Sequence, residues 1–309
     1  MSSVPHPPSA APGAITSAAP DATVRPCLVA EDVAKSYGST VALAGTSLTI
    51  DPGEAVAVMG PSGSGKTTLL HCLSGIVSPT AGAIRLDAGS GAVRVDQLDA
   101  AGRAKLRRES LGFVFQQGML VPELTAVENV ALPLLLNGAG RADAERHASR
   151  WLTALGLDGL DDRRIGQLSG GQAQRVAIAR AQVIDPAIVF ADEPTGALDS
   201  TTAADVMDAL IASTAGRGRT LVVVTHDPDV AHSCSRILTL HDGRITSDVR
   251  RPERPPQRHP AGQPEGQPEG QPAPAIVGHR PAENGVRSVR GIADDARGAA
   301  GDTRDGADR

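Results

Sequence analysis

The sequence predicts an α/β domain between about residues 28 and 248. Short runs of β-branched residues alternate with helical patterns in this region, as in domains built on a mostly parallel sheet. One such run, residues 56–59, leads directly into a glycine-rich segment and then into a helical pattern. A third observation sets the limits of the domain, because the composition of the chain changes at both ends of this region.

The two flanking segments are expected to be disordered. Residues 1–27 are rich in Ala, Pro and Ser without periodicity, and the segment 249–309 contains a Gly-Gln-Pro-Glu repeat at 262–272. Such segments bury too little apolar surface to offset the entropy of ordering them. From residue 251 onward nine arginines stand against nine acidic residues, so a polybasic membrane anchor is poorly supported.

Composition excludes several classes of protein. A net charge of -5 and a pI near 5.9 argue against nucleic-acid binding through bulk positive charge. The three cysteines show no metal-binding spacing, which favours reduced thiols. No run approaches the roughly 18–20 apolar residues of a membrane span, and no basic residue precedes an apolar segment as in a signal peptide.

The first predicted strands lie at about 28–33 and 41–50, and the third at 56–59. Residues 60–67, called here the phosphate loop, match the full pattern G-x-x-x-x-G-K-[ST], whose backbone N–H groups converge on phosphate oxygens. Lys66, one of only three lysines, is expected to neutralise the β- and γ-phosphates, and Thr67 to coordinate Mg²⁺. The predicted phosphate-binding residues are Gly60, Pro61, Ser62, Gly63, Ser64, Gly65, Lys66, Thr67 and Thr68.

A helical region is predicted to follow the next strand. The apolar run 112–115 ends at Gln116, and either this amide or that of Gln117 could lie at the strand tip. Helical patterns then cover residues 124–130 and 142–155, and Pro133 is expected to kink or interrupt the first helix. Trp151, the only tryptophan, is interpreted as a core or interface anchor rather than a substrate contact.

The next helix is expected to begin at Ser169. Its small first residues leave room for a phosphate, and the serine hydroxyl and backbone amides would point donors at it. The strand 188–191 then delivers Asp192 and Glu193 to its C-terminal end, where ligands bind in open parallel sheets. Asp192 is expected to hold Mg²⁺ through water, and Glu193 to polarise a hydrolytic water as general base.

The last part of the domain is predicted to hold a strand and a hairpin. The strand 221–225 ends at His226, whose neutral ring can donate or accept a hydrogen bond. Residues 238–245 predict a closing hairpin with an Asp-Gly turn.

The motifs together resemble one family. Residues 168–172 read Leu-Ser-Gly-Gly-Gln, called here the signature segment, and they lie between the phosphate loop and the acidic strand end at 188–193. In this order and spacing the set resembles the ATP-binding cassette family, over about residues 28–248. The resemblance implies a phosphate-loop NTPase fold: a RecA-like core, an antiparallel β subdomain and an α-helical subdomain inserted at about 117–184.

The resemblance also implies roles for individual residues. Tyr37, the only tyrosine, would stack on adenine, and Gln116 would contact Mg²⁺ and the attacking water. His226 would contact the γ-phosphate. The signature segment would face the nucleotide bound by a second copy of the chain, so that two chains are needed to close two sites. The residues at that contact would be Ser169, Gly170, Gly171, Gln172 and Asp199.

The function implied is an ATPase that uses ATP and Mg²⁺ to drive a separately encoded membrane permease, either an exporter or a mechanotransmission complex. Residues 124–130 resemble the group that serves lipoprotein release, macrolide export, cell division and peptide resistance. The protein would be cytoplasmic and peripheral on the inner face of the cell membrane, without a nucleic-acid partner. The alternative is a non-transport cassette ATPase of DNA repair or translation, for which the chain lacks inserted coiled coils, zinc modules and a second cassette.

Overall fold

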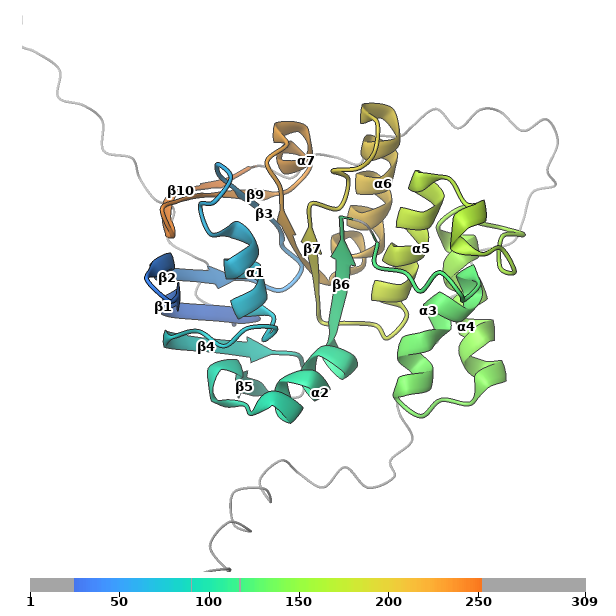
Figure 1. The fold of residues 1–309 in the computed structure, drawn as a ribbon, viewed down its shortest axis with the longest axis horizontal. Coiled ribbons are helices and arrows are strands. Elements are labelled where there is room, and N and C mark those ends of the chain that lie inside the picture. Colours follow the sequence, from blue (N-terminus) through green and yellow to red (C-terminus); the bar gives the residue numbers. More distant parts are fainter. Residues whose placement is uncertain (1–24, 90, 117, 252–309) are drawn as a thin grey trace, which may run out of the picture. The chain divides into compact units, whose positions relative to one another are not determined.

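The core of the fold is a six-stranded sheet of order β10-β9-β3-β8-β7-β6 (Figure 1). The computed structural model describes residues 25–89, 91–116 and 118–251. The sheet consists of β3 (Ala55–Met59), β6 (Leu111–Phe115), β7 (Ile188–Asp192), β8 (Thr220–Val224), β9 (Arg236–His241) and β10 (Arg244–Arg250). All neighbouring strands pair in parallel except β9 and β10.

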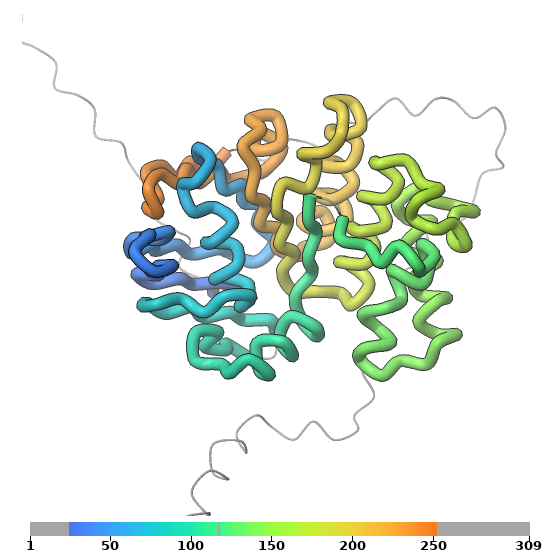
Figure 2. The backbone as a smooth tube through the Cα atoms, in the orientation of Figure 1, coloured from blue at the N-terminus to red at the C-terminus, as the bar shows by residue number. Residues whose placement is uncertain are grey.

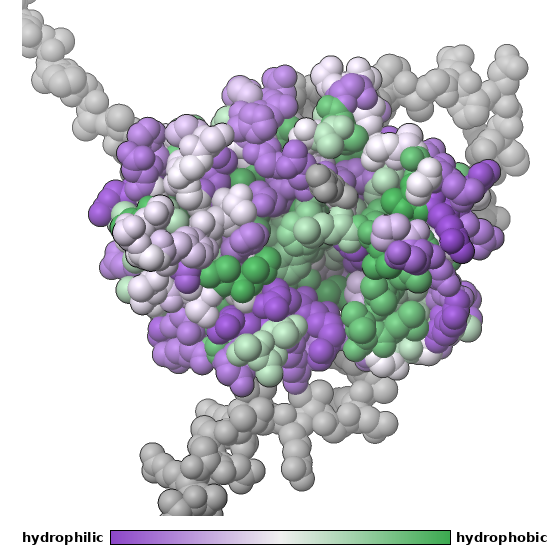
Figure 3. All heavy atoms as spheres, viewed as in Figure 1, coloured by the Kyte–Doolittle hydropathy of each residue, from purple (hydrophilic) through white to green (hydrophobic). Residues whose placement is uncertain are grey.

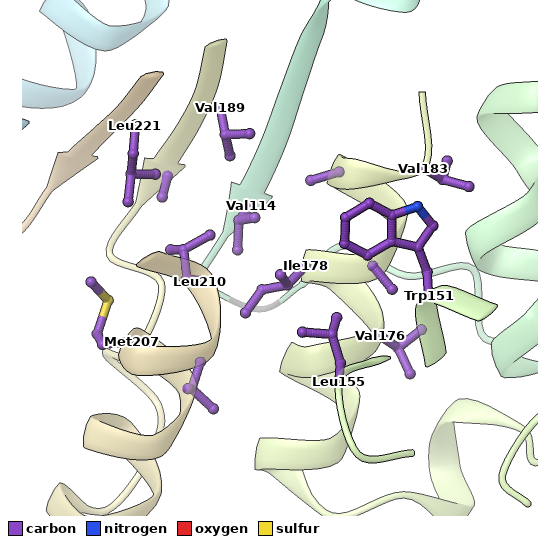
Figure 4. Packing of buried hydrophobic residues seen from close by; sticks show 14 of the residues in the cluster. Val114, Trp151, Leu155, Val176, Ile178, Val183, Val189, Met207, Leu210 and Leu221 are labelled. Atoms are coloured by element: carbon purple, nitrogen blue, oxygen red, sulfur yellow. The ribbon is translucent and has the colours of Figure 1, made fainter. Parts of the chain in front are cut away.

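The central strands are apolar throughout because both of their faces are covered. Alternate residues of β8 point into different layers: Leu221 and Val223 join one apolar cluster, and Val222 and Val224 join the other. The first cluster packs against the helices and includes Trp151, which is 6% exposed (Figure 4). This confirms the interpretation of the tryptophan as a core residue. The second cluster packs against α1 (Lys66–Leu73) and the smaller sheet.

The smaller sheet is antiparallel and has the order β2-β1-β4-β5. Its strands are β1 (Leu28–Tyr37), β2 (Thr40–Ile50), β4 (Ala81–Asp87) and β5 (Ala92–Arg94). β1 is longer than the predicted 28–33, because its C-terminal part stays paired with β2 up to Tyr37 opposite Thr40. The short helix α2 (Ala100–Ser110) leads from this sheet into β6.

Helices α3 (Ala126–Leu136), α4 (Arg141–Ala154), α5 (Gly170–Gln182) and α6 (Ser200–Ser213) pack beside the large sheet, with α7 (Pro228–His232) after β8. Of the two outcomes expected at Pro133, a kink or an interruption, the interruption is wrong, because α3 continues to Leu136. Proline removes a single backbone hydrogen bond, whereas Val130 and Ala131 before it are fully buried and Leu134 after it packs on the core. Short 3₁₀ turns complete the described secondary structure at Val95–Gln97, Ile165–Gln167 and Ala215–Arg217.

The C-terminal hairpin lies beside the N-terminal strands, as the tube in Figure 2 shows. Ala44 N donates to the carbonyl of Gly243 at 3.0 Å, and the Thr46 hydroxyl donates to the same oxygen at 2.6 Å. Asp242 and Gly243 both have positive φ, 46° and 68°, which is the geometry of the predicted Asp-Gly turn.

The predicted domain limits need small corrections at both ends. Cys27, placed in the disordered N-terminal segment, is buried and its N–H donates to Ile50 O at 2.9 Å. Strand β10 runs to Arg250, beyond the predicted limit of 248, because it pairs with β9 as far as Arg236. The predictions for 1–24, 252–309 and Gln117 lie outside the described residues. Among the residues described, no helix is both long and apolar enough to span a membrane.

Candidate active site

Three neighbouring parallel strands deliver the candidate site residues to one edge of the sheet. β3 ends at the phosphate loop, β7 ends at Asp192 and Glu193, and β8 is followed by Thr225 and His226. Their C-terminal ends meet at the same edge because β3 pairs with β8 and β8 with β7 in parallel. Helix α1, which follows the phosphate loop, packs against β7 and β8. Ligands of open α/β sheets bind at such an edge.

The phosphate loop is a tight turn that buries two of its polar side chains, Ser64 and Lys66. Lys66 is 9% exposed, and its Nζ donates to the carbonyl oxygens of Gly60 (2.8 Å) and Pro61 (3.0 Å). The Ser64 hydroxyl is buried without a hydrogen-bond partner among the described residues. A buried hydroxyl without a partner is costly, and a bound phosphate would supply the missing acceptor. The loop and the N-terminus of α1 therefore fit an anionic ligand.

Thr67 and Asp192 form the part of the site suited to a hard cation. The Thr67 hydroxyl donates to Asp192 Oδ1 at 3.2 Å, which joins α1 to the end of β7. Burial raises the pKa of Asp192, and the hydrogen bond from Thr67 opposes that effect. A cation bound beside this carboxylate would also lower the pKa of Asp192. Hydroxyl and carboxylate oxygens are the ligands that Mg²⁺ takes in nucleotide sites.

Glu193 lies next to Asp192 but points to different partners. Its carboxylate Oε1 lies 2.8 Å from Nδ1 of His226, and Thr225 Oγ1 donates to Oε2 at 3.4 Å. Its φ is +47°, a conformation that non-glycine residues adopt at a cost and that Glu193 shares with four other described non-glycine residues. Its N–H donates to Val224 O at 2.9 Å, which fixes this turn to β8. A carboxylate oriented by an imidazole nitrogen and a hydroxyl is placed to accept a proton from a water molecule.

Gln116 directly follows β6, as predicted. A Cβ added to Gly196 would lie 2.9 Å from Gln116 Nε2, so this amide lies against the loop that follows Glu193. Tyr37 lies at the end of β1 and is 50% exposed, with Lys35 Nζ 5.2 Å from the centre of its ring. One aromatic face is thus approached by a cation in a cation–π geometry. The exposed ring leaves area on which a flat base can stack.

The signature segment is built as a helix start, and it lies apart from the phosphate loop. The Ser169 hydroxyl accepts from Gln172 N at 3.2 Å, and Gln172 Oε1 accepts from Ser169 N at 2.9 Å, which is a capping box. A Cβ on Gly171 would lie 2.5 Å from Thr202 Cγ2, so α5 begins close against α6. Helices α5 and α1 stand on opposite sides of β6 and β7 in Figure 1. One chain therefore does not bring the two segments together.

Asp199 has a local role in the same region. It is the N-cap of α6, and its Oδ1 accepts from Thr202 N at 3.0 Å. That backbone hydrogen bond lowers the pKa of Asp199. This capping role accounts for an acidic residue at position 199 without any contact to a second chain.

Sequence reasoning missed two residues of α5 that hold the segment around Gln116. Gln174 Nε2 donates to Phe115 O at 3.0 Å, and Arg180 donates to the carbonyls of Gly118 (2.6 Å) and Met119 (2.7 Å). No local pattern signals these bonds, because the partners are carbonyl oxygens at least 59 residues away in the sequence.

The fold and these strand-end groups define a class of protein: an α/β nucleotide-binding ATPase with a phosphate loop. The chain belongs to the ABC transporter family. The family pattern matches residues 43–196. The lipoprotein-releasing system ATP-binding protein LolD of Legionella pneumophila is 45% identical over 71% of this chain and 96% of that protein. LolD 1 of Rhodospirillum rubrum is 44% identical over 66% of this chain and 89% of its own length.

Two further comparisons bear on function. The macrolide export ATP-binding/permease protein MacB of Marinobacter nauticus is 45% identical over 72% of this chain, and the chain spans only 35% of that protein. Among solved structures, the dimeric bacterial ABC transporter cassette MJ0796 is 40% identical with a TM-score of 0.65, covering 72% of this chain and 98% of that one. A second structure of that cassette is a dimeric post-hydrolysis state bound to ADP and Pi, also at a TM-score of 0.65.

These findings confirm the predicted family, the cassette fold and an ATP-binding ATPase of the transport type. The alternative of a DNA-repair or translation ATPase is not favoured.

Proposed function

We propose that this chain binds ATP with Mg²⁺ at the edge formed by β3, β7 and β8, hydrolyses it through Glu193, and couples the reaction to a separate membrane permease. The observation that carries the proposal is the convergence at this edge of the phosphate loop, the Thr67–Asp192 pair and the Glu193–His226 pair. Each supplies one requirement of phosphoryl transfer: a phosphate cradle, oxygen ligands for a metal, and a base.

In the binding step the phosphate loop receives the triphosphate and Tyr37 receives the adenine. Lys66 exchanges the carbonyls of Gly60 and Pro61 for the β- and γ-phosphates, and Ser64 gains an acceptor. Thr67, Asp192 and Gln116 are the residues that would hold Mg²⁺. The metal would neutralise charge that develops on the phosphate oxygens.

In the hydrolytic step Glu193 accepts a proton from the attacking water. The water oxygen bonds to the γ-phosphorus as the bond from that phosphorus to the oxygen of ADP breaks. Nδ1 of His226 lies 2.8 Å from the Glu193 carboxylate and orients it, and the exposed ring would contact the γ-phosphate. The products are ADP and phosphate.

A second copy of the chain would complete each site. The signature segment forms the first turn of α5, where backbone N–H groups point toward a possible anion, but it stands apart from the phosphate loop of its own chain. Two chains placed head to tail would bring each signature segment to the nucleotide held by the other. The related cassette MJ0796 was solved as a dimer, which supports this arrangement.

The permease is proposed to dock near α3. Met119 and Leu136 are 66% and 63% exposed, and Figure 3 shows apolar residues gathered over this side of the described surface. Relatives named for lipoprotein release and for macrolide export support an export or mechanotransmission complex. The chain would then work at the inner face of the cell membrane.

The direct test of the chemistry is Glu193→Gln in the full-length chain. We expect ATP binding to persist and ATP hydrolysis to fall by roughly 10²–10⁴, the usual contribution of a positioned base. Glu145→Gln, which changes a glutamate paired with Arg141 on α4, is the matched control and should hydrolyse ATP at the normal rate. Near-normal turnover of Glu193→Gln would contradict the assignment of the base.

A further inference from the structure

Helix α5 holds the backbone on both sides of Gln116. The buried side chain of Gln174 donates to Phe115 O, the residue before Gln116, at 3.0 Å. Two nitrogens of Arg180 donate to Gly118 O and Met119 O at 2.6 and 2.7 Å. Three carbonyl oxygens around one candidate metal ligand therefore accept hydrogen bonds from a single helix.

Arg180 depends on these carbonyls for its hydrogen bonds. Burial lowers the pKa of its guanidinium, and among the described ion pairs no carboxylate partners it. A cation that is partly withdrawn from water is costly unless its N–H groups are satisfied. The planar fork of arginine reaches two neighbouring carbonyls at once, whereas the ammonium of lysine is a compact point charge.

The same helix also carries the signature segment at its start. Ser169 caps α5, while Gln174 and Arg180 lie further along it. The amide of Gln116 lies against Gly196, whose N–H donates to Glu193 O at 3.1 Å. A movement of α5 would therefore move the backbone around Gln116 relative to the loop that carries Glu193.

We propose that Gln174 and Arg180 are positioning residues, which set Gln116 at the metal and the attacking water and tie that placement to the position of the signature helix. This inference rests on the proposed role of Gln116 as a metal ligand. Helix α5 would then do two things: it would present the signature segment to another subunit, and it would hold the backbone around Gln116 in its own chain. Closure of the signature segment on a nucleotide would thereby be transmitted to Gln116 of the same chain.

Metal binding measured apart from turnover gives the test. The full-length chain with Glu193→Gln is saturated with ATP, and Mn²⁺ binding in place of Mg²⁺ is followed by electron paramagnetic resonance. Arg180→Lys, Gln174→Met and Gln116→Ala are compared. Arg107→Lys is the matched control, because Arg107 also donates to a carbonyl, that of Gly75 at 2.6 Å, and burial likewise lowers its pKa.

We expect all three test variants to bind Mn²⁺ about tenfold more weakly, the effect typical of groups that orient a metal ligand. ATP binding without metal and Mn²⁺ binding by Arg107→Lys should stay normal. Amide hydrogen exchange near Gln116 without nucleotide should become faster in Arg180→Lys and Gln174→Met. If Arg180→Lys folds poorly, Gln174→Met carries the test, since it keeps the length of the side chain and removes the amide that donates to Phe115 O.

Two contrary results have different meanings. Normal Mn²⁺ binding by Gln116→Ala would remove Gln116 from the metal site, and the proposal about α5 would fall with that part of the proposed function. Weak binding by Gln116→Ala together with normal binding by both Arg180→Lys and Gln174→Met would overturn only the proposal about α5. A lower melting temperature of these two variants without a change in Mn²⁺ affinity would have the same meaning, since it indicates a purely structural role.

Discussion

Gly60 shows how little room the phosphate loop leaves for side chains. A Cβ added to Gly60 would lie 2.1 Å from the carbonyl oxygen of Leu240 in β9, at a φ of +150°. Gly63 in the same loop has a φ of +80°, but nothing lies within 4 Å of an added Cβ. The two glycines share a backbone that disfavours side chains, and only Gly60 is also limited by close packing.

This contrast predicts unequal costs for two alanine substitutions. Gly63→Ala should lower the free energy of unfolding by about 1–2 kcal/mol, the cost of a left-handed backbone for a residue with a Cβ. Gly60→Ala should cost about 3 kcal/mol or more, because β9 must also move. Chemical denaturation of both variants measures the difference. Equal losses would show that the approach to Leu240 does not constrain the loop.

At this scale the sequence predicts residues whose chemistry follows from a local pattern. Lys66 and Thr67 are set by the spacing of the phosphate loop, and Asp192 and Glu193 by their position after an apolar strand. Arg180 could not be predicted, since its partners are backbone carbonyls 61 and 62 residues away. A carbonyl oxygen is present at every residue and therefore leaves no signal in the sequence.

Among the elements, α3 depends on one buried amide at its N-terminal turn. Asn129 is fully buried; its Oδ1 accepts from Val121 N at 2.8 Å and its Nδ2 donates to Val121 O and Thr125 O at 3.0 Å each. Asn129 lies in the segment that resembles the lipoprotein-release group. Its hydrogen bonds are all to backbone atoms nearby in the chain. It fixes the turn at 121–125 to the helix that follows.

Loss of this amide is predicted to destabilise the protein more than loss of a surface amide. Asn129→Ala would leave the partly buried N–H of Val121 without its acceptor and would remove one donor each from the carbonyls of Val121 and Thr125, at about 1–3 kcal/mol. Asn137→Ala is the control at the other end of α3, where the amide exchanges hydrogen bonds with exposed Arg108. Thermal unfolding compares them. A loss for Asn137→Ala as large as that for Asn129→Ala would contradict the account of this turn.

Element types were predicted more reliably than element ends. Apolar strands and their polar C-terminal residues are local features, and β3, β7 and β8 lie where the pattern placed them. The continuation of α3 through Pro133 and the extension of β1 to Tyr37 depend on contacts with distant residues. The order β10-β9-β3-β8-β7-β6 likewise depends on contacts between segments far apart in the chain.

For the whole molecule, the main consequence of the fold is that the phosphate loop and the signature segment lie apart within one chain, which is the basis of the proposed composite site. The phosphate loop precedes α1 and the signature segment begins α5, and the strands β6 and β7 stand between these helices (Figure 1). The order of the motifs in the sequence predicts this division only through the family resemblance. The separation of the two segments within one chain is the observation on which the proposed second copy rests.

The measurement that tests this account most directly is the nucleotide-dependent assembly of the full-length chain, followed by analytical sedimentation. With ATP, Glu193→Gln should sediment as a dimer, because two γ-phosphates then bridge the halves and meet helix-end donors from both chains. Glu193→Gln combined with Ser169→Arg should remain monomeric. Glu193→Gln combined with Ser247→Arg, at an exposed position of β10, is the control and should dimerise. Dimerisation of the Ser169→Arg combination as complete as that of Glu193→Gln alone would remove the signature segment from the interface and contradict the composite site.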